Sequence, residues 1–460
     1  MLDRRRLLNV AWDIWRTGRG GSAAVAARQQ TRLADLIEFA RARSPLYRKL
    51  YNQLPVRITD LRQLPPVTKP GLMANFDEWV TDPTVTRAGV EAFVADKMLV
   101  GHLFLDRYAV WTSSGITGER GIFVVDGGAL AVYWALMGVR GILAWMKPKH
   151  LWAVRRRGGR RVAVMIATGD HFAAATFGEL SRRLRRWLPD RSHTFSVLSP
   201  LPELVQTLND FQPTILLGYS TVMTLLAHEQ AAGRLRINPV VVFTGAECLA
   251  PAAGNQIAAA FNCVVRDDYS ASEFMGIACD CGHGWLHVNS DWVILEPVDE
   301  TYRPVPPGQA SRTALLTNLA NRVQPIIRYD LGDSITLNPD PCPCGSPLPA
   351  IRVEGRRDEI LSFQAPGGEA IRLLPLALET VVQEVPEVRR FQVIQTTPAR
   401  LSIRLEMAPG VDGHEIWRTV AHRLSDYLSA QGLPAVGLEK APEPPQRDPV
   451  SGKFRQVWAA

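Results

Sequence analysis

Between residues 161 and 265 the sequence alternates between short apolar runs and longer segments with helical spacing, and this alternation limits the folds open to the chain. The apolar runs, rich in β-branched residues, span 162–167, 215–217, 240–243 and 264–265. The helical segments span 172–187, 201–209, 221–232 and 251–260. Because helices alternate with the strands, successive strands pair in parallel and helices cover both faces of the sheet. The sequence therefore predicts an α/β fold built on parallel α/β layers.

The segments on either side of this region predict further units. The first fifty residues have helical spacing that ends at Ser44-Pro45, since proline interrupts a helix. Beyond Glu273 the strand-like segments lack helical crossovers and predict an antiparallel β subdomain; they span 286–296, 314–319 and 325–337.

A charged stretch at 354–359 precedes a last unit of the chain. This unit contains a predicted hairpin (390–393 with 401–405), a predicted helix at 414–428 and a proline-rich tail that we interpret as loop. The predicted domains are a large N-terminal domain over 1–354, which includes the β subdomain at about 279–350, and a small α+β domain over 355–460.

Composition and charge exclude several classes of protein. With 46% hydrophobic and 21% charged residues, the chain is neither disordered nor a fibrous repeat. The net charge of +7 is spread too thinly for the basic stripe of a nucleic-acid binder, so no nucleic-acid partner is predicted. No run reaches the roughly 18 apolar residues that span a bilayer, and the longest candidate, 129–146, predicts a buried helix. We predict a cytoplasmic protein without integral membrane association. A basic amphipathic first helix on a membrane surface is the alternative to a solvated one.

Clustered cysteines indicate a metal site. Cys281, His287, Cys342 and Cys344 supply three thiolates and an imidazole, the donor set of a tetrahedral structural Zn²⁺. Cys279 and His283 are competing ligands. Because clustered thiols in a cytosolic chain favour a metal over disulfides, zinc is preferred to four reduced thiols or to a redox pair.

The segment 111–121, Trp-Thr-Ser-Ser-Gly-Ile-Thr-Gly-Glu-Arg-Gly, is rich in hydroxyls and glycines. Backbone N–H groups in such a loop can cradle phosphate oxygens, and small side chains allow close approach. The loop is not a Walker loop, because no Gly-Lys-Ser/Thr follows. Taken alone, it is equally compatible with an ordinary turn.

Other short segments occur in a particular order along the chain. Gly245-Ala246-Glu247 ends a predicted parallel strand, and 268–273 (Asp-Tyr-Ser-Ala-Ser-Glu) follows the next strand. Tyr329-Asp330-Leu331-Gly332-Asp333, Gly355-Arg356-Arg357-Asp358 and Ser451-Gly452-Lys453 come later. In this order and spacing, together with Arg-Ser-Pro-Leu-Tyr-Arg at 43–48, the segments resemble the adenylate-forming (ANL) superfamily of acyl-CoA synthetases and adenylation domains. Within it, the chain is most similar to the phenylacetate–CoA ligase branch and to the deazaflavin-cofactor adenylylating synthetases.

The resemblance implies roles for residues at matching positions. Those implied to bind ATP are Ser113, Ser114, Gly115, Thr117, Gly118, Gly245, Ala246, Glu247, Asp268, Tyr269, Ser270, Asp333 and Arg356. Glu273 is implied to help hold Mg²⁺, and Asp333 to bind the ribose hydroxyls. Asp358 would be the hinge of a mobile C-terminal domain, and Lys453 its catalytic cation in adenylation. Each carboxylate or lysine taken alone would be a cap or a solvated charge.

The acyl pocket is implied to include Gly218 and Tyr219 with Tyr133 and Trp134. Aromatic side chains suit an aryl acid, but on a buried helix they are more often plain core. The loop departs from the superfamily at Ile116 and at Glu119-Arg120, and 365–369 is only a loose counterpart of the glycine-rich strand that helps admit CoA.

The implied reaction has two steps. A small, aromatic or otherwise planar carboxylic acid attacks Mg·ATP to give acyl-AMP, and a thiol of CoA or of a carrier protein's phosphopantetheine then displaces AMP. The alternatives are an amine acceptor, transfer of AMP to a cofactor hydroxyl, and a zinc-stabilised protein that binds nucleic acid. The sequence leaves the oligomeric state open, a homodimer included.

Overall fold

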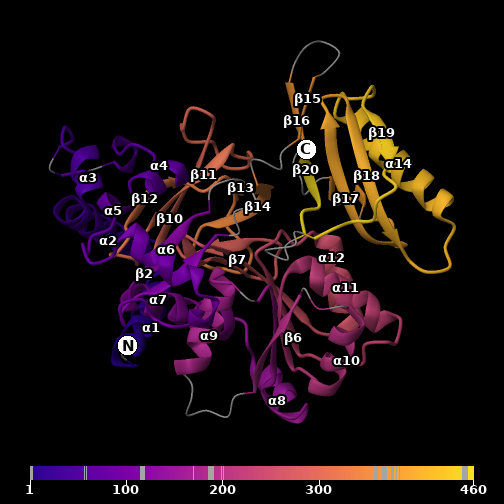
Figure 1. Cartoon of the computed structure of the whole chain (residues 1–460), viewed down its shortest axis with the longest axis horizontal. Helices are drawn as coiled ribbons and strands as arrows, with labels where there is room; N and C mark the ends of the chain where they lie inside the picture. The colour runs from indigo at the N-terminus through magenta and orange to yellow at the C-terminus, as the bar shows by residue number, and fades with distance from the viewer. Residues whose placement is uncertain are drawn as a thin grey trace.

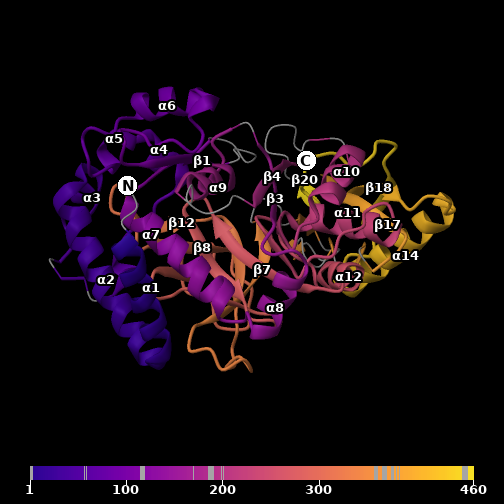
Figure 2. The same ribbon diagram turned by 90° about the horizontal axis from the view of Figure 1, so that it is seen from below.

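The computed structural model of the chain describes residues 4–447 and 454–460, apart from 56, 59, 114–119, 169, 185–190, 198, 200, 357–360, 365–369, 374–377, 380 and 383. Figure 1 shows helices from the N-terminal part at one end, sheets in the middle and a smaller C-terminal unit against α11 and α12. Figure 2 shows the same arrangement from below, with α1 beside α7.

Helices dominate the first hundred residues, as the spacing predicts. Ser44 ends α2 in an extended conformation, and its side chain accepts the N–H of Tyr47 to begin α3. The elements here are α1 (Arg4–Arg19), α2 (Gly21–Arg43), α3 (Pro45–Leu50), η1 (Leu61–Gln63), α4 (Lys69–Ala74), α5 (Phe76–Trp79), α6 (Arg87–Ala95) and η2 (Lys97–Leu99).

A nine-stranded sheet forms the centre of the molecule, in the order β13-β14-β9-β8-β7-β6-β5-β3-β4. Five of its strands pair in parallel: β3 (Val162–Ile166), β4 (Ser192–Ser196), β5 (Ile215–Gly218), β6 (Val241–Gly245) and β7 (Val264–Ala271). The crossover helices are α9 (Ala173–Leu184), α10 (Leu201–Phe211), α11 (Ser220–Ala231) and α12 (Pro251–Phe261). The predicted parallel α/β layers are confirmed.

The antiparallel strands differ from the prediction in one respect. β8 (Phe274–Asp280), β9 (Leu286–Val288), β13 (Asp333–Leu337) and β14 (Ala350–Arg356) extend the parallel sheet instead of forming a separate one. The separate three-stranded sheet contains β10 (Val293–Val298), β11 (Thr313–Asn318) and β12 (Ile326–Asp330). The predicted strand 286–296 is therefore divided into β9 and β10, and the predicted strand 325–337 into β12 and β13. In each case a turn separates two strands that belong to different sheets.

The segment between η2 and β3 forms a hairpin and three helical stretches. These are β1 (Ala109–Thr112), β2 (Ile122–Val125), α7 (Gly127–Leu136), the π-helical η3 (Met137–Leu143) and α8 (Pro148–Arg156). Most of α7 is buried, but Leu143 at the end of η3 is 66% exposed, so the prediction of a buried helix over 129–146 is wrong for its second half. Within the described residues no single helix passes a length-and-hydropathy test for spanning a membrane, and one pair, Gly127–Leu143 with Pro148–Arg156, passes it jointly across a 95° bend.

The C-terminal unit has its own hydrophobic core, made of residues between Leu361 and Val457. Its elements are β15 (Leu361–Gln364), β16 (Ala370–Leu373), β17 (Val388–Thr397), β18 (Arg400–Met407), α14 (Gly413–Ala430), β19 (Gly437–Lys440) and β20 (Val457–Ala459). The predicted hairpin and helix are confirmed, whereas β19 and β20 show that the tail is not all loop. The domain division at 354/355 stays a prediction.

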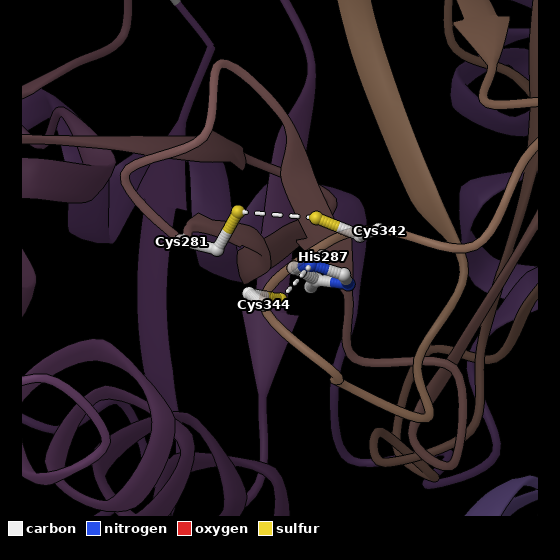
Figure 3. Close-up of side chains that lie close together, drawn as sticks. All are labelled: Cys281, His287, Cys342 and Cys344. Atoms are coloured by element: carbon white, nitrogen blue, oxygen red, sulfur yellow. Dashed lines mark hydrogen bonds between the residues drawn. The ribbon is translucent and has the colours of Figure 1, made fainter.

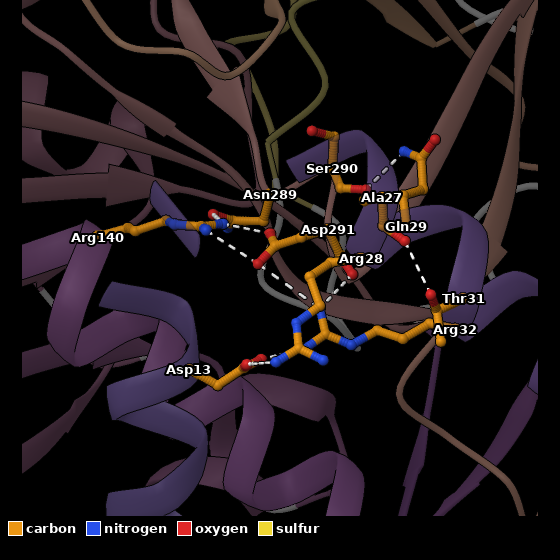
Figure 4. A network of polar contacts seen from close by, with 10 residues as sticks. All are labelled: Asp13, Ala27, Arg28, Gln29, Thr31, Arg32, Arg140, Asn289, Ser290 and Asp291. Carbon is orange, nitrogen blue, oxygen red and sulfur yellow. Dashed lines mark hydrogen bonds and ion pairs between the residues drawn. The ribbon is translucent and has the colours of Figure 1, made fainter. Parts of the chain in front are cut away.

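A buried polar network fastens the N-terminal helices to the turn before β10 (Figure 4). Asp291 is fully buried and accepts bonds of 2.6 and 3.0 Å from the two Nη atoms of Arg140 on η3. Arg32 on α2 donates to the carbonyl of Asp291 at 2.6 Å and also pairs with Asp13 on α1. Since three helices meet one loop through these charges, the network fixes their positions.

Candidate functional site

The carboxyl ends of three neighbouring parallel strands form the floor of the candidate site. Gly218 of β5 lies opposite Thr244 of β6, and Gly245 lies opposite Asp268 of β7. A Cβ at Gly245 would lie 3.1 Å from the carbonyl oxygen of Asp268, so the glycine allows a close approach. Ala246, the next residue, has a φ of +63°, a left-handed conformation that is uncommon outside glycine. The predicted strand-end residues therefore meet at one edge of the sheet, where open α/β sheets bind ligands.

The stem of the predicted phosphate loop lies beside this edge. Two hydrogen bonds join Ser113 and Gly121 at the two ends of the loop. The N–H of Ser113 donates to the Gly121 carbonyl, and the N–H of Gly121 donates to Ser113 Oγ, both at 2.9 Å. Trp111 in β1 donates its indole N–H to the carbonyl of Ser272 at 2.8 Å. The stem is thereby tied to the turn that carries Glu273. The other predicted loop residues lie outside the described residues: Ser114, Gly115, Thr117 and Gly118.

Glu273, predicted to help hold Mg²⁺, is only 8% exposed. Asn318 on β11 positions it by donating to the Glu273 carbonyl at 2.9 Å. Burial raises the pKa of Tyr329, and the nearby Glu273 carboxylate raises it further. A largely buried carboxylate offers the hard oxygen ligands that Mg²⁺ prefers.

Asp333, the predicted ribose ligand, has two partners from other strands. Tyr269 donates its hydroxyl to Asp333 Oδ2 at 2.6 Å, and Arg356 donates to Oδ1 at 3.0 Å. Burial raises the pKa of Tyr269 well above its ordinary value, and the charge of Asp333 adds to this effect. Ser270 Oγ donates to Asp268 Oδ2 at 2.5 Å within the same strand. The structure thus brings the predicted pair Asp333 and Arg356 together with Tyr269.

Glu247 joins the strand ends to the C-terminal tail. Its Oε2 accepts bonds from the N–H and the hydroxyl of Thr221 at the start of α11, at 3.1 and 2.8 Å. Its Oε1 accepts the backbone N–H of Phe454 at 3.1 Å. The carboxylate therefore points toward α11 and the tail. Lys453, the residue before Phe454, and the predicted hinge residue Asp358 lie outside the described residues.

The predicted acyl-pocket residues are closely packed. Tyr133 is 1% exposed and its hydroxyl accepts a bond from Asn318 at 2.9 Å, while Trp134 donates to Ser181 Oγ at 2.8 Å. Burial raises the pKa of Tyr219 to about 12, and a Cβ at Gly218 would lie 2.6 Å from the Met165 carbonyl oxygen. These contacts are typical of core residues, and the acyl-pocket role stays a prediction.

The four predicted zinc ligands lie close together (Figure 3). One ligand atom from each of Cys281, His287, Cys342 and Cys344 lies within 4.8 Å of all the others. The Cys281 and Cys342 sulfurs are 3.7 Å apart, and Cys344 Sγ is 3.1 Å from His287 Nε2. His287 Nδ1 contacts the Leu348 carbonyl at 2.9 Å, which leaves Nε2 facing the thiols. Cys279 instead contacts Asp268, at 3.7 Å, and is not part of this cluster.

Several solved structures have a similar fold. No protein-family model matches the chain. A structure of 2-hydroxyisobutyryl-CoA ligase in the postadenylation state, with an acyl-AMP, aligns with a TM-score of 0.68 at 20% identity over 95% of this chain and 89% of that chain. Anthranilate CoA ligase AuaEII with anthranoyl-AMP gives 0.52 at 17% identity over 75% and 64%. The amide bond synthetase McbA from Marinactinospora thermotolerans gives 0.50 at 14% over 74% and 66%.

The chain has the fold of the adenylate-forming (ANL) superfamily. Among curated proteins, protein CapK of Staphylococcus aureus is 24% identical over 225 residues, 48% of each chain, so the match spans about half of that relative's length. The same 2-hydroxyisobutyryl-CoA ligase gives a TM-score of 0.52 in its thioesterification state. The structure of this chain is therefore more similar to the structure of that ligase in its postadenylation state.

Three site contacts were not predicted from the sequence. They are the bond from Trp111 to Ser272, the bond from Phe454 to Glu247, and an ion pair between Glu229 on α11 and Arg389 on β17. Each joins residues more than 150 positions apart. For the first two, the order of the ANL motifs is the one signal in the sequence, because the resemblance implies that these segments surround the same site.

Proposed function

We propose that this protein is an adenylate-forming ligase, which activates a carboxylic acid with ATP as acyl-AMP and transfers the acyl group to an acceptor. The observation that carries the proposal is the bond from Phe454 to Glu247, because it holds the segment beside Lys453 at the strand ends that carry Asp268 and Tyr269. The fold of the acyl-AMP-bound ligases supports the same reading.

The described residues support a division of labour for the first step. Asp333, oriented by Tyr269 and Arg356, would accept the ribose hydroxyls. The β1–β2 loop would supply backbone N–H groups to the phosphates, and Glu273 would hold Mg²⁺, which when bound neutralises phosphate charge. Lys453 would stabilise charge as the acid oxygen attacks the α-phosphorus and pyrophosphate leaves. The bond from Trp111 to the Ser272 carbonyl supports this division, because it joins the described stem of the loop to the residue before Glu273.

For the second step we propose a thiol acceptor, CoA or a carrier protein's phosphopantetheine, and an aryl or other planar acid, as in the phenylacetate–CoA ligase branch. The thiol attacks the acyl carbonyl, and AMP leaves with the bonding electrons. The C-terminal unit would rotate about Asp358, and this rotation would move Lys453 out of the site before the thiol attacks. The alternative acceptors are an amine and a cofactor hydroxyl, and the experiment below distinguishes a hydroxyl from the thiol.

Acid-dependent exchange of labelled pyrophosphate into ATP tests the proposal. We expect exchange with an aryl acid, and AMP release when CoA is added. Lys453→Ala should abolish exchange but retain thioester formation from supplied acyl-AMP, while Arg418→Gln on the exposed face of α14 serves as the matched control. Label retained in a larger product would instead identify AMP transfer to a hydroxyl. ATP binding without exchange for any acid would refute the ligase proposal.

We also propose that the four-residue cluster binds structural Zn²⁺. With Zn–S bonds near 2.3 Å, two sulfurs of a tetrahedral site lie about 3.8 Å apart, and the Cys281–Cys342 separation is 3.7 Å. Bound zinc would join β9 to the loop between β13 and β14. Cys342→Ser should lower both the zinc content and the thermal midpoint, whereas Cys263→Ala, outside the cluster, should retain the metal. Full zinc content in Cys342→Ser would show that other ligands bind it.

A further inference from the structure

Large apolar side chains are exposed mainly on three neighbouring helical elements. Among the described residues, eight large apolar side chains are more than 40% exposed, and six of them lie on α1, η3 and α8. These six are Leu8, Trp12, Trp15, Leu143, Leu151 and Trp152. Such clustering indicates a binding surface, because isolated exposed apolar residues would be scattered over the molecule.

On α1 the exposed apolar residues form one stripe. Leu8, Trp12 and Trp15 have spacings of four and three, which place them on the same helix face, and the two indole rings stack at 4.8 Å. Ile14, one position away from Trp15, faces the core and is 1% exposed. The core therefore takes only part of the helix's apolar surface, and the Trp stripe remains on the outside.

The charge around these side chains is positive. No Asp or Glu occurs between Asp126 and Asp170, while the segment 137–161 contains eight Arg and Lys residues. On α8, Arg156 lies 4.5 Å over the ring of Trp152, and on α1 Arg19 lies 4.8 Å over the ring of Trp15. The one acidic residue of α1, Asp13, is paired with Arg28 and Arg32.

The three elements lie on one side of the molecule. α1 packs against α7 and η3, and α8 follows η3 after a 95° bend, as Figure 2 shows. The buried ion pair between Arg140 and Asp291 ties η3 to the core, and Asp13 ties α1 to α2 (Figure 4). The ion pairs therefore hold α1 and η3, which carry exposed apolar residues, against the rest of the molecule.

We propose that α1, η3 and α8 form a surface that binds an anionic phospholipid bilayer. Tryptophan and leucine side chains ringed by arginine and lysine match the acyl boundary and the phosphate headgroups of such a bilayer. A second copy of the chain would bring the same positive charges against each other. A nucleic acid would complement the charge but would gain little from Leu143 and Leu151.

Cosedimentation of the full chain with vesicles tests this surface. We expect binding to vesicles of phosphatidylcholine mixed with phosphatidylglycerol, weak binding to phosphatidylcholine alone, and weakening by salt. The triple variant Lys149→Gln, Arg155→Gln, Arg156→Gln should lower the partition coefficient on the order of 100-fold, from about fivefold per basic residue at an anionic surface. The double variant Trp12→Ala, Trp152→Ala should lower it about tenfold by removing buried aromatic area.

Matched controls lie outside the three elements. Met98→Ala removes an apolar side chain that is 83% exposed on η2, and Arg418→Gln removes an exposed charge on α14; both should bind as the parent does. Unchanged thermal midpoints should show that all variants are folded. Failure of the parent to bind anionic vesicles in low salt would refute the proposal, as would equal binding of the tryptophan variant. A concentration-dependent dimer in sedimentation velocity that the tryptophan variant abolishes, without vesicle binding, would assign the surface to self-association instead.

Discussion

Replacing Arg389 by Met is expected to shift the equilibrium between domain arrangements. Arg389 on β17 donates to Glu229 on α11 at 2.6 Å, and the two side chains are 13% and 5% exposed. A cavity of about 360 Å³ lies nearby between the two units, lined by Leu204 and Leu225 on one side and Arg390 on the other. Beside this cavity, the ion pair makes a direct charged contact between α11 and β17.

The size of the shift depends on the hydrogen bonds that Glu229 keeps in the Arg389→Met variant. Arg234, on the same side of the interface, still donates to the carboxylate, and its hydrogen bond is the main cause that lowers the pKa of Glu229. The variant therefore removes one charge-assisted bond without leaving a buried charge uncompensated. Such a bond contributes about 1.5–3 kcal/mol, which corresponds to a shift of roughly 10- to 100-fold in the equilibrium between arrangements.

Two assays measure the shift. If the proposed adenylation uses the present arrangement, pyrophosphate exchange should fall by the factor by which the populated fraction of that arrangement falls, while thioester formation from supplied acyl-AMP should not fall. Distance measurement between fluorophores on α14 and α11 should show a broader distribution, independently of the reaction catalysed. Arg400→Met, which breaks an exposed pair with Glu439 inside the C-terminal unit, should change neither. An unchanged distance distribution in Arg389→Met would refute the reasoning, as would an equal loss of both half-reactions.

Two further predictions concern stability. Burial raises the pKa of Asp267 to about 7 from an ordinary value of 3.8, so the folded state holds a proton that the unfolded state releases between these values. Stability relative to Asp267→Asn should therefore fall as pH rises from about 4 to about 7, as measured by urea unfolding at several pH values, and a constant difference would contradict this assignment. Asp291→Ala should cost about 3–5 kcal/mol of unfolding free energy, because Arg140 and Arg32 lose a buried partner. The half-buried Asp13→Asn should cost about 1 kcal/mol in the same denaturation experiment, and equal costs would show that burial does not decide the effect.

The sequence predicts the parallel strands well because their apolar runs have a clear period. It misses β4, whose residues Ser192–Ser196 are mostly polar and lie at the sheet edge. It also misses β19 and β20, two short strands at the edges of the C-terminal sheet. Edge strands are held by backbone hydrogen bonds, which any residue except proline can donate, so their side chains carry little signal. The division of 286–296 had a visible cue in Asp291, a charge within an apolar run.

The candidate site could be predicted in parts. The strand-end residues and the cysteine cluster follow from local patterns, and the structure brings Gly245 beside Asp268 and Cys281 beside Cys342. The ion pair between Glu229 and Arg389 could not be predicted, because the local sequence around a helical glutamate or a strand arginine does not show which distant residue it pairs with. Only the packing of β17 against α11 makes them partners.

The contact between β17 and α11 shares one structural unit with the proposed nucleotide site, and this has an energetic consequence. Glu229 lies on α11, the helix whose first turn is held by Glu247, and Glu247 follows β6 and binds the backbone of Phe454. We therefore predict that a ligand that shifts the end of β6 acts on the tail and, through α11, on the Arg389 pair. A ligand that binds only this arrangement must bind less tightly when the Arg389 pair is removed, by the factor by which the populated fraction of this arrangement falls. ATP affinity in Arg389→Met should consequently fall together with the fraction of molecules in the present arrangement, and a normal affinity with a shifted arrangement would show that the two sites are independent.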